Sequence, residues 1–390
     1  MPAKKSAPKK STDLKARTLA AQAMGYVEPT TKAVVAPLHV ATTYLRDPDN
    51  QYRAGFAYGR ADNATVRQTE EVIATLENAR AALLFGSGMS AATTIVMAHA
   101  PCHIVASQVM YWAFRHWLTT EAQRFGHTIT IVDTSDLGAV KRAVVPGKTK
   151  LVFIETPGNP LWTITDIAAV AKIAHAAGAR LAVDSTVGTS VFTQPLSLGA
   201  DLVMHSASKY LNGHSDVIAG AVACARKDAL WQRIETLRSQ HGLLLGPFEA
   251  WLLMRGLRTL DVRVRAGTKT AGLLAARLAN NPHVSGVLYP GLRNHPGHAI
   301  AKRQMTGFGA MISVLVKRGE RAAIKTAANV KVWKRATSLG GVESLIEHRG
   351  SVEGPTSPCP MNLLRLSVGL EDPDDLYSDL AQALAKASRK

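Results

Sequence analysis

A lysine and an aspartate beside buried strands are the residues of this sequence best suited to chemistry. Lys209 follows the apolar run 201–205 and comes directly after a short stretch with two serines, Ser206 and Ser208. Lysine is costly to bury unless it is paired or used, and a desolvated lysine amine is a nucleophile that can form a Schiff base with an aldehyde. Asp184 closes another apolar run and supplies a carboxylate at a neighbouring strand end.

A glycine-rich turn adds an anion-binding element. Residues 86–91 (GSGMSA) lie between a predicted strand and a predicted helix, where glycines let backbone N–H groups approach an anion at a helix N-terminus. The turn fits a dinucleotide fingerprint, G-x-G-x-x-A, but lacks the acidic residue expected about 20 positions later. We interpret it as a phosphate cradle, with a nucleotide-dependent enzyme as the alternative.

Together these parts suit pyridoxal 5'-phosphate. That cofactor brings an aldehyde for Lys209, a pyridine nitrogen for Asp184 and a phosphate for the glycine-rich turn. The hydroxyls of Ser206 and Ser208 would add donors to the same phosphate.

Strand-like and helix-like segments alternate through the first half of the chain and would position these residues. Such alternation predicts a mainly parallel sheet with helices on both faces, in which ligands bind at the carboxyl ends of the strands. A long helix over 248–280 then leads to a second unit. The predicted strands are 81–85, 103–107, 128–132, 150–155, 180–184, 201–205, 309–316 and 363–368, and the predicted helices after residue 80 are 88–99, 113–125, 136–145, 165–177, 319–329 and 373–387.

The amino-acid composition limits the classes of protein to which this chain can belong. Hydrophobic residues make up 46% of the 390 residues and charged residues 19%, a balance typical of a globular protein with a sizeable core. No apolar run has the length of a transmembrane helix. Three scattered cysteines are too few for a disulfide framework or a thiolate metal site, so we expect no metal and a reducing compartment, the cytoplasm.

The net charge of +17 raises the question of a nucleic-acid partner. Part of this charge lies in residues 1–17, which are rich in Lys, Ala, Pro and Ser, lack the apolar core of a secretory signal, and are interpreted as a disordered tail. The rest is spread along the chain without an aromatic-interleaved basic stripe. We therefore expect no nucleic acid and no membrane among the partners, with binding through the tail as the alternative.

Motifs around these residues resemble those of the cysteine and methionine metabolism family of pyridoxal-phosphate enzymes. That family includes the cystathionine lyases and synthases, methionine γ-lyase and the homoserine sulfhydrylases. The resemblance is collinear from about residue 30 to the C-terminus and implies a fold-type I α/β architecture, with a large mainly parallel sheet domain and a smaller C-terminal α/β domain. The matching segments are 58–60 (YGR), 63–65 (NAT), 86–89 (GSGM), 155–160 (ETPGNP), 183–184 (VD), 205–216 (HSASKYLNGHSD), 338–346 (SLGGVESLI) and 364–369 (LRLSVG).

The resemblance implies a role for each matching residue. Lys209 would bind the cofactor and later shuttle protons, Asp184 would keep the pyridine nitrogen protonated, and Tyr111 would stack on the ring. Arg365 would bind the substrate α-carboxylate, a bidentate task that suits a guanidinium. Asn159 and Ser338 would orient that carboxylate and the cofactor, while Gly88, Met89, Ser206 and Ser208 would bind the phosphate.

The resemblance also implies an assembly. Tyr58 and Arg60 would reach the phosphate of a neighbouring subunit, so that each site needs a dimer and the protein is a tetramer built from two dimers. The expected domains are a basic tail at 1–17, an arm at 18–60 that contributes to the neighbouring subunit, a cofactor-binding domain at 61–255 and a C-terminal domain at 256–390.

Among the reactions of the family, we expect β-elimination from L-cystathionine, giving homocysteine, pyruvate and ammonia. This is the trans-sulfuration step of methionine biosynthesis. Members that act at the γ-carbon often carry an acidic residue directly before the serine matching Ser338, and here that position is Thr337. The alternative is a γ-enzyme: cystathionine γ-lyase, methionine γ-lyase, cystathionine γ-synthase or an O-acyl-homoserine sulfhydrylase.

Overall fold

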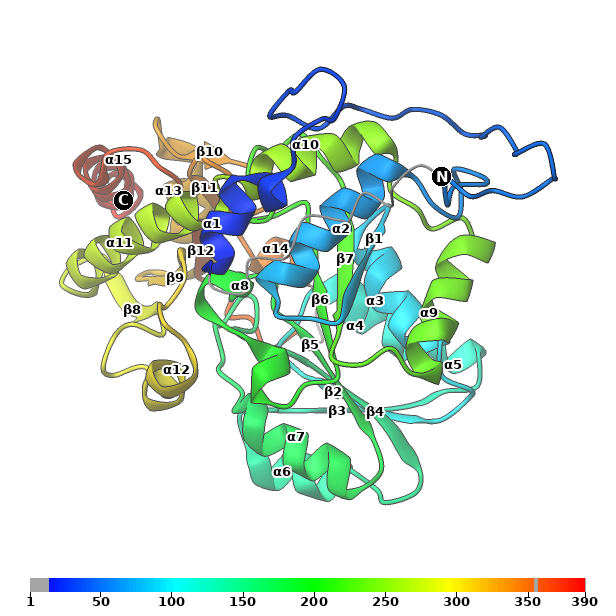
Figure 1. Cartoon of the computed structure of the whole chain (residues 1–390). Helices are drawn as coiled ribbons and strands as arrows, with labels where there is room; N and C mark the ends of the chain where they lie inside the picture. The colour runs from blue at the N-terminus through cyan, green and yellow to red at the C-terminus, as the bar shows by residue number, and fades with distance from the viewer. Residues whose placement is uncertain (1–13, 354–356, 390) are drawn as a thin grey trace.

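A seven-stranded sheet forms the centre of the larger part of the molecule (Figure 1). The computed structural model describes residues 14–353 and 357–389. The strand order is β1-β7-β6-β5-β4-β2-β3, and every pairing is parallel except those of β7, which runs antiparallel to both its neighbours. The strands are β1 (Ala81–Phe85), β2 (His103–Ser107), β3 (Thr128–Val132), β4 (Thr149–Glu155), β5 (Arg180–Asp184), β6 (Leu202–His205) and β7 (Gly220–Cys224).

Apolar residues on both faces of this sheet explain why helices cover it on either side. Leu151 and Phe153 of β4 pack in one buried cluster, whereas Val152 and Ile154 pack in another. This alternation follows from the two-residue period of a strand. The covering helices are α2 (Ala64–Leu76), α3 (Gly88–Met97), α4 (Trp112–Thr119), α5 (Glu121–Arg124), α6 (Leu137–Ala143), α7 (Ile167–Ala176) and α9 (Ala229–Gln240).

A second, five-stranded sheet lies in the C-terminal part, with the order β10-β11-β12-β9-β8. It is mostly antiparallel, and β12 is central, so the residues of β12 have partners on both sides. Its elements are β8 (Val284–Leu288), α12 (His298–Gln304), β9 (Met311–Val316), α13 (Gly319–Asn329), β10 (Lys334–Arg335), β11 (Leu345–His348), α14 (Gly350–Glu353), β12 (Leu363–Ser367) and α15 (Pro373–Ala387).

The single helix expected over 248–280 is two helices. α10 (Pro247–Leu257) packs against α2, and α11 (Leu260–Ala279) packs against β8 and β9 of the second sheet. The chain changes direction at Arg258 and Thr259, so the two helices pack against different elements. Sequence periodicity alone does not reveal such a change of partner.

The N-terminal segment runs over the surface before the first sheet begins. It is largely irregular, as expected, but includes α1 (Ala16–Ala21) and a short 3-10 helix, Ala23–Gly25. Figure 1 shows residues 26–60 as a long arm over one end of the molecule. Of the predicted tail at 1–17, residues 1–13 lie outside the described part of the chain. Two short helices, α8 (Thr189–Phe192) and a 3-10 turn at Pro195–Leu198, link β5 to β6.

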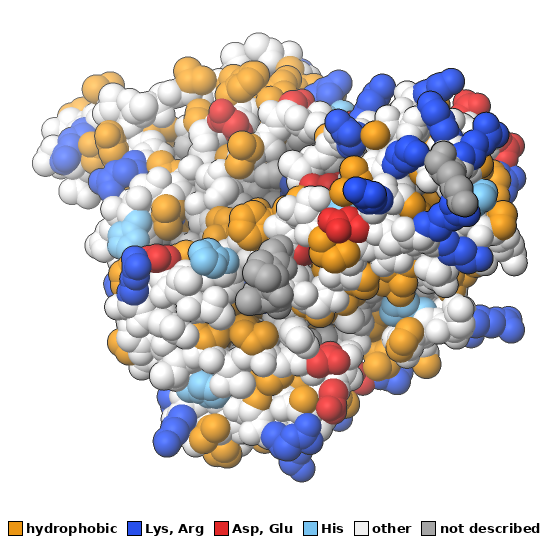
Figure 2. All heavy atoms as spheres, turned by 180° about the vertical axis from the view of Figure 1, so that it is seen from behind, with side chains coloured by type: hydrophobic (Ala, Val, Ile, Leu, Met, Phe, Trp, Pro, Cys, Tyr) orange, Lys and Arg blue, Asp and Glu red, His pale blue; other side chains and the backbone are white. Residues whose placement is uncertain are grey.

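Basic side chains are scattered over the surface seen in Figure 2 and gather on the side of the second sheet. Among the described residues, no helix combines the length and apolar character needed to cross a bilayer.

Candidate active site

The chemistry-bearing segments meet at one edge of the seven-stranded sheet, the edge formed by the carboxyl ends of its parallel strands. Glu155, the last residue of β4, is paired in register with Asp184, the last residue of β5, and Asp184 is paired with Met204 of β6. Lys209 follows β6, and Gly86 follows β1. The parallel topology therefore brings together segments as far apart in the sequence as Gly86 and Lys209.

Lys209 is held at this edge by a contact from the second sheet domain. Its Nζ donates a hydrogen bond to Ser338 Oγ at 2.8 Å. Burial lowers the pKa of the Lys209 amine, and the positive charges of Arg365 and Arg349 lower it further. A lysine with a lowered pKa has more of the neutral amine that acts as nucleophile or base.

Ser338 adopts a backbone conformation that is unusual for its type, with φ at +121°. Non-glycine residues in this region carry strain of about 1–3 kcal/mol and cluster at functional sites. The strained conformation lets Ser338 serve two partners, because its hydroxyl faces Lys209 while its carbonyl oxygen accepts from Arg365 Nη2 at 2.8 Å.

Arg365 lies at the centre of β12 and is only 4% exposed. Its Nη1 donates to Asn159 Oδ1 at 3.1 Å, so the two residues predicted to handle the substrate carboxylate are in direct contact. Burial lowers the pKa of the Arg365 guanidinium to about 10, and the charge of Arg349 acts in the same direction. The guanidinium is therefore a desolvated cation, which favours the arrival of an anion.

Asp184 and Glu155 form a buried pair of carboxyl groups. Burial raises the pKa of Asp184, although hydrogen bonds from Thr186 oppose this rise. Burial also raises the pKa of Glu155 well above its ordinary range, and repulsion from Asp184 adds to the effect. Asp184 Oδ1 accepts from Thr186 N at 2.9 Å.

Glu155 is a site residue to which sequence reasoning gave no role, although it lies in a matched motif. Its Oε2 accepts from the backbone N–H of Tyr111 at 2.7 Å, and its Oε1 accepts from the backbone N–H of Asn159 at 2.8 Å. It thereby ties the start of α4 to the loop after β4. Two sequence signals could have found it: its place in the matched segment 155–160 and its position as the last residue of an apolar strand.

A buried histidine and glutamate form a further close contact beneath the site. His205, the last residue of β6, contacts Glu77 through its Nε2 at 2.7 Å from Glu77 Oε1, and both side chains are almost fully buried. The charge of His205 is one of the influences that lower the pKa of Asp184. Sequence reasoning missed this pair, because Glu77 lies 128 positions away and belongs to no motif.

The glycine-rich turn forms a cradle next to the serines after β6. Ser87 is the N-cap of α3 and accepts from Ser90 N. A Cβ at Gly88 would lie 2.8 Å from Ser206 Cβ, so only glycine allows the helix N-terminus to approach Ser206 this closely. Ser208 uses its hydroxyl within the fold, since it accepts from Ala219 N at 2.8 Å and donates to Ala219 O at 3.2 Å.

The remaining predicted residues lie nearer the surface. Met89 occupies the first turn of α3 beside Gly88. Tyr111, the N-cap of α4, is 43% exposed. Tyr58 is 52% exposed, and the guanidinium of Arg60 lies over its ring at 5.8 Å from the centroid. Arg60 Nη1 also donates to Ser239 O at 3.0 Å.

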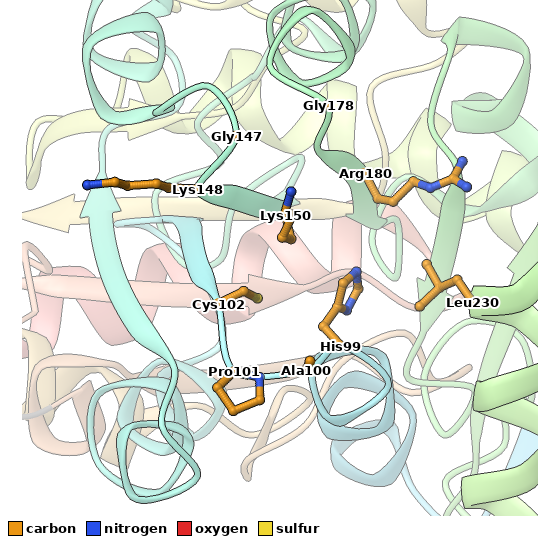
Figure 3. Close-up of a pocket in the computed structure, with 10 residues that line it drawn as sticks. All are labelled: His99, Ala100, Pro101, Cys102, Gly147, Lys148, Lys150, Gly178, Arg180 and Leu230. Atoms are coloured by element: carbon orange, nitrogen blue, oxygen red, sulfur yellow. The ribbon is translucent and has the colours of Figure 1, made fainter.

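A separate hollow lies at the amino ends of the strands, the edge opposite Lys209 (Figure 3). It has a volume of about 470 Å³. Cys102 precedes β2 there, and Lys148 precedes β4. None of the residues to which the sequence analysis gave a chemical role lines this hollow.

The residues present fit pyridoxal phosphate. Its aldehyde, ring nitrogen and phosphate require three partners, and the site offers a lysine of lowered pKa, a buried carboxylate at a strand end and a helix N-terminus beside a serine. The described residues hold no group of three His, Cys, Asp or Glu side chains that could bind a metal.

Fold and site together define a fold-type I pyridoxal-phosphate-dependent enzyme. A family model described as Cys/Met metabolism PLP-dependent enzyme matches residues 17–385. The chain belongs to this family, and the predictions of family, fold class and cofactor are confirmed.

Relatives of known name cover nearly the whole chain. Cystathionine gamma-synthase of Mycobacterium tuberculosis (strain ATCC 25618 / H37Rv) is 42% identical over 364 residues, which cover 92% of this chain and 93% of the relative. Cystathionine gamma-lyase of Bacillus subtilis (strain 168) is 41% identical over 363 residues, which cover 91% and 95%. A crystal structure of cystathionine gamma synthase from Xanthomonas oryzae pv. oryzae superimposes with a TM-score of 0.92 at 35% identity, covering 96% of this chain and 99% of that one.

Proposed function

We propose that this enzyme acts at the γ-carbon of a four-carbon amino acid, making or cleaving the carbon–sulfur bond of cystathionine. The names of its relatives support this proposal, since the three described above are all γ-enzymes at 35–42% identity. The alternative that the sequence left open is thus better supported than the β-lyase first expected.

One arrangement carries the mechanism: Ser338 links the amine of Lys209 to the guanidinium of Arg365. A substrate whose α-carboxylate binds Arg365 has its α-carbon next to the Lys209 amine. Pyridoxal phosphate, when bound, supplies an aldehyde that condenses with an amine and a ring that accepts electrons from the α-carbon.

Lys209 is the group that moves protons. Burial and the nearby guanidinium groups lower the pKa of its amine, so that it can accept a proton from the α-carbon at neutral pH. Action at the γ-carbon requires a second proton to be removed from the β-carbon, and we assign this transfer to Lys209 as well. The Ser338 hydroxyl accepts from Nζ and keeps the amine pointed at the substrate.

Asp184 and Asn159 have supporting roles, Asp184 toward the cofactor ring and Asn159 toward the guanidinium of Arg365. Asp184 would pair with the ring nitrogen, and its charged form, disfavoured by burial alone, would be favoured once a cation pairs with it. Asn159 accepts from Arg365 through its side-chain oxygen and so helps to hold the guanidinium in place for an incoming carboxylate. Tyr111, which is 43% exposed, would stack on the ring.

β-Elimination is the second candidate because of Thr337. This residue is exposed and directly precedes Ser338, so the site lacks a carboxylate at the position where many γ-enzymes of the family have one. A β-lyase needs one proton removal rather than two and has less need of such a group.

The proposal also includes a tetrameric assembly and a cytoplasmic location. Exposure of Tyr58 and the surface position of Arg60 support an arm that completes the site of a neighbouring subunit, within a tetramer of two dimers. The three cysteines are free, as befits an enzyme of the reducing cytoplasm.

The deciding experiment identifies the keto acid released from L-cystathionine by purified, cofactor-loaded enzyme. We expect 2-oxobutyrate, the product of γ-elimination, or, with cysteine and an acylated homoserine, net formation of cystathionine by γ-replacement. Pyruvate as the main keto acid, without cystathionine synthesis, would refute the γ-assignment and establish the β-lyase.

A further inference from the structure

Five charged side chains run in a line from α4 to the substrate end of the site. Glu347 on β11 lies opposite Arg365 on β12, and its Oε2 accepts from Arg365 Nη2 at 2.6 Å. The same oxygen accepts from Arg349 Nη1 at 2.8 Å. Arg349 Nη2 donates to Glu353 Oε1, and Glu353 Oε2 lies 3.7 Å from Arg115 Nη2. We call these five residues the charge chain.

The charge chain is buried along its whole length. Its side chains are between 1% exposed, for Glu353, and 12% exposed, for Glu347. Buried charges persist only when they are paired and hydrogen-bonded. Burial opposes the charged form of Arg349, but the two glutamates together raise the pKa of its guanidinium. Arg349 is thus a permanent cation between two carboxylates.

Charge does not balance within the charge chain. Three arginines face two glutamates, which leaves one positive charge in a region with little water. Glu347 by itself would neutralise Arg365, but it divides its Oε2 between Arg365 and Arg349. Arg365 therefore keeps part of this net positive charge, and it lies at the end of the charge chain that would face the substrate.

We propose that Arg349 is a positioning residue for substrate binding, which shares Glu347 with Arg365 and so keeps Arg365 both fixed in place and incompletely neutralised, with its charge available to an amino-acid carboxylate. Glu353, paired with Arg115, holds Arg349 in turn. The inference rests on the proposed function, since it takes Arg365 as the carboxylate-binding residue. Arg349 supplies position and charge and does not touch the reacting atoms.

Removal of Arg349 has a defined electrostatic result. Glu347 would keep Arg365 as its partner, and Glu353 would keep Arg115, so neither carboxylate is left alone. Glu347 would then be matched to Arg365 only, and the net charge of the chain would fall to zero. The carboxylate of an incoming amino acid would then lose the net positive charge that attracts it and would bind more weakly. The binding of an amine without a carboxylate would not change.

The test compares two ligands that differ only by a carboxylate, L-alanine and ethylamine, in titrations of the cofactor absorbance of the loaded enzyme. The ratio of their dissociation constants measures what the carboxylate contributes. We expect Arg349→Gln to weaken L-alanine binding by roughly tenfold, the effect of one charge interaction in a partly shielded site, and to leave ethylamine binding unchanged. Arg349→Lys, which keeps the charge, should restore most of the ratio.

Arg365→Gln separates the inference from the function on which it rests. If Arg365→Gln leaves the ratio unchanged, the proposed carboxylate site itself is wrong. If Arg365→Gln changes the ratio and Arg349→Gln does not, or if Arg349→Gln weakens both ligands equally, the role of Arg349 is refuted while the function stands. Melting of the cofactor-free variants checks the fold, and Arg349→Met, which fills the same space, replaces Arg349→Gln should the latter not fold.

Discussion

Gly88→Ala tests the phosphate cradle most directly, because the structure gives the size of the clash. The added Cβ would lie 2.8 Å from Ser206 Cβ and 3.0 Å from Ser206 Cα, whereas carbon atoms in contact prefer about 3.5–4.0 Å. The methyl group meets the base of the serine side chain and its backbone, which cannot rotate away. The N-terminus of α3 must therefore retreat from Ser206 by roughly 1 Å.

That retreat moves the N–H groups of the α3 N-terminus out of hydrogen-bond range of a phosphate held beside Ser206. A hydrogen bond to a charged group contributes about 1.5–3 kcal/mol, so loss of one corresponds to roughly 10- to 150-fold weaker cofactor binding. The assay is titration of cofactor-free protein with pyridoxal phosphate, followed by absorbance or by tryptophan fluorescence.

Gly272→Ala is the matched control. Gly272 lies within α11, and a Cβ there would meet nothing within 4 Å. Alanine at that position should leave cofactor affinity unchanged and stabilise the helix by about 0.5–1 kcal/mol. A folded Gly88→Ala protein that binds the cofactor as tightly as the wild type would show that the phosphate does not lie between α3 and Ser206.

Three further predictions concern single residues. Lys209→Ala should abolish turnover and covalent retention of the cofactor, measured by absorbance after gel filtration; residual turnover in that variant would argue against the assignment of Lys209. Arg60→Ala should speed cofactor loss from the assembled protein, and a monomer with full cofactor occupancy, identified by sedimentation, would disprove the shared site. Burial, aided by repulsion from His298, lowers the pKa of His295 to about 4. The unfolded chain therefore binds more protons between pH 6.5 and 4, and stability should fall as the pH drops through this range. The drop in urea midpoint should be smaller in His295→Asn, and equal drops would exclude His295 as the cause.

Local patterns predicted most of the larger sheet. Six of its seven strands agree with their predicted ranges to within one residue, and α7 lies inside the range predicted for it. The strand β7 was not predicted. It lies between β6 and β1, and β1 is more than 100 positions earlier in the chain, so local patterns do not reveal this pairing. The break between α10 and α11 escaped prediction for a similar reason, since both segments have a helical period and only their packing partners differ.

The candidate site also contains some residues that motifs predicted and others that only the structure revealed. Motifs predicted Lys209 and Arg365, whose residue types suit their chemistry, and the structure links the two through Ser338. Glu155 and Glu347 were given no role, since an isolated glutamate carries no signal of its own. Each acquires a role only when a strand pairing sets it opposite another charged residue.

The sequence by itself thus determined the family and the cofactor, and it predicted residues for the chemistry, because all three depend on residue type and on short spacings within motifs. The tertiary structure decided the pKa values of those residues and the contacts that fix their positions. The lowered pKa of Lys209 and the surplus positive charge behind Arg365 come from the burial of groups that lie far apart in the chain. Burial and long-range pairing are properties of the folded molecule, and the spacing of residues along the chain does not specify them.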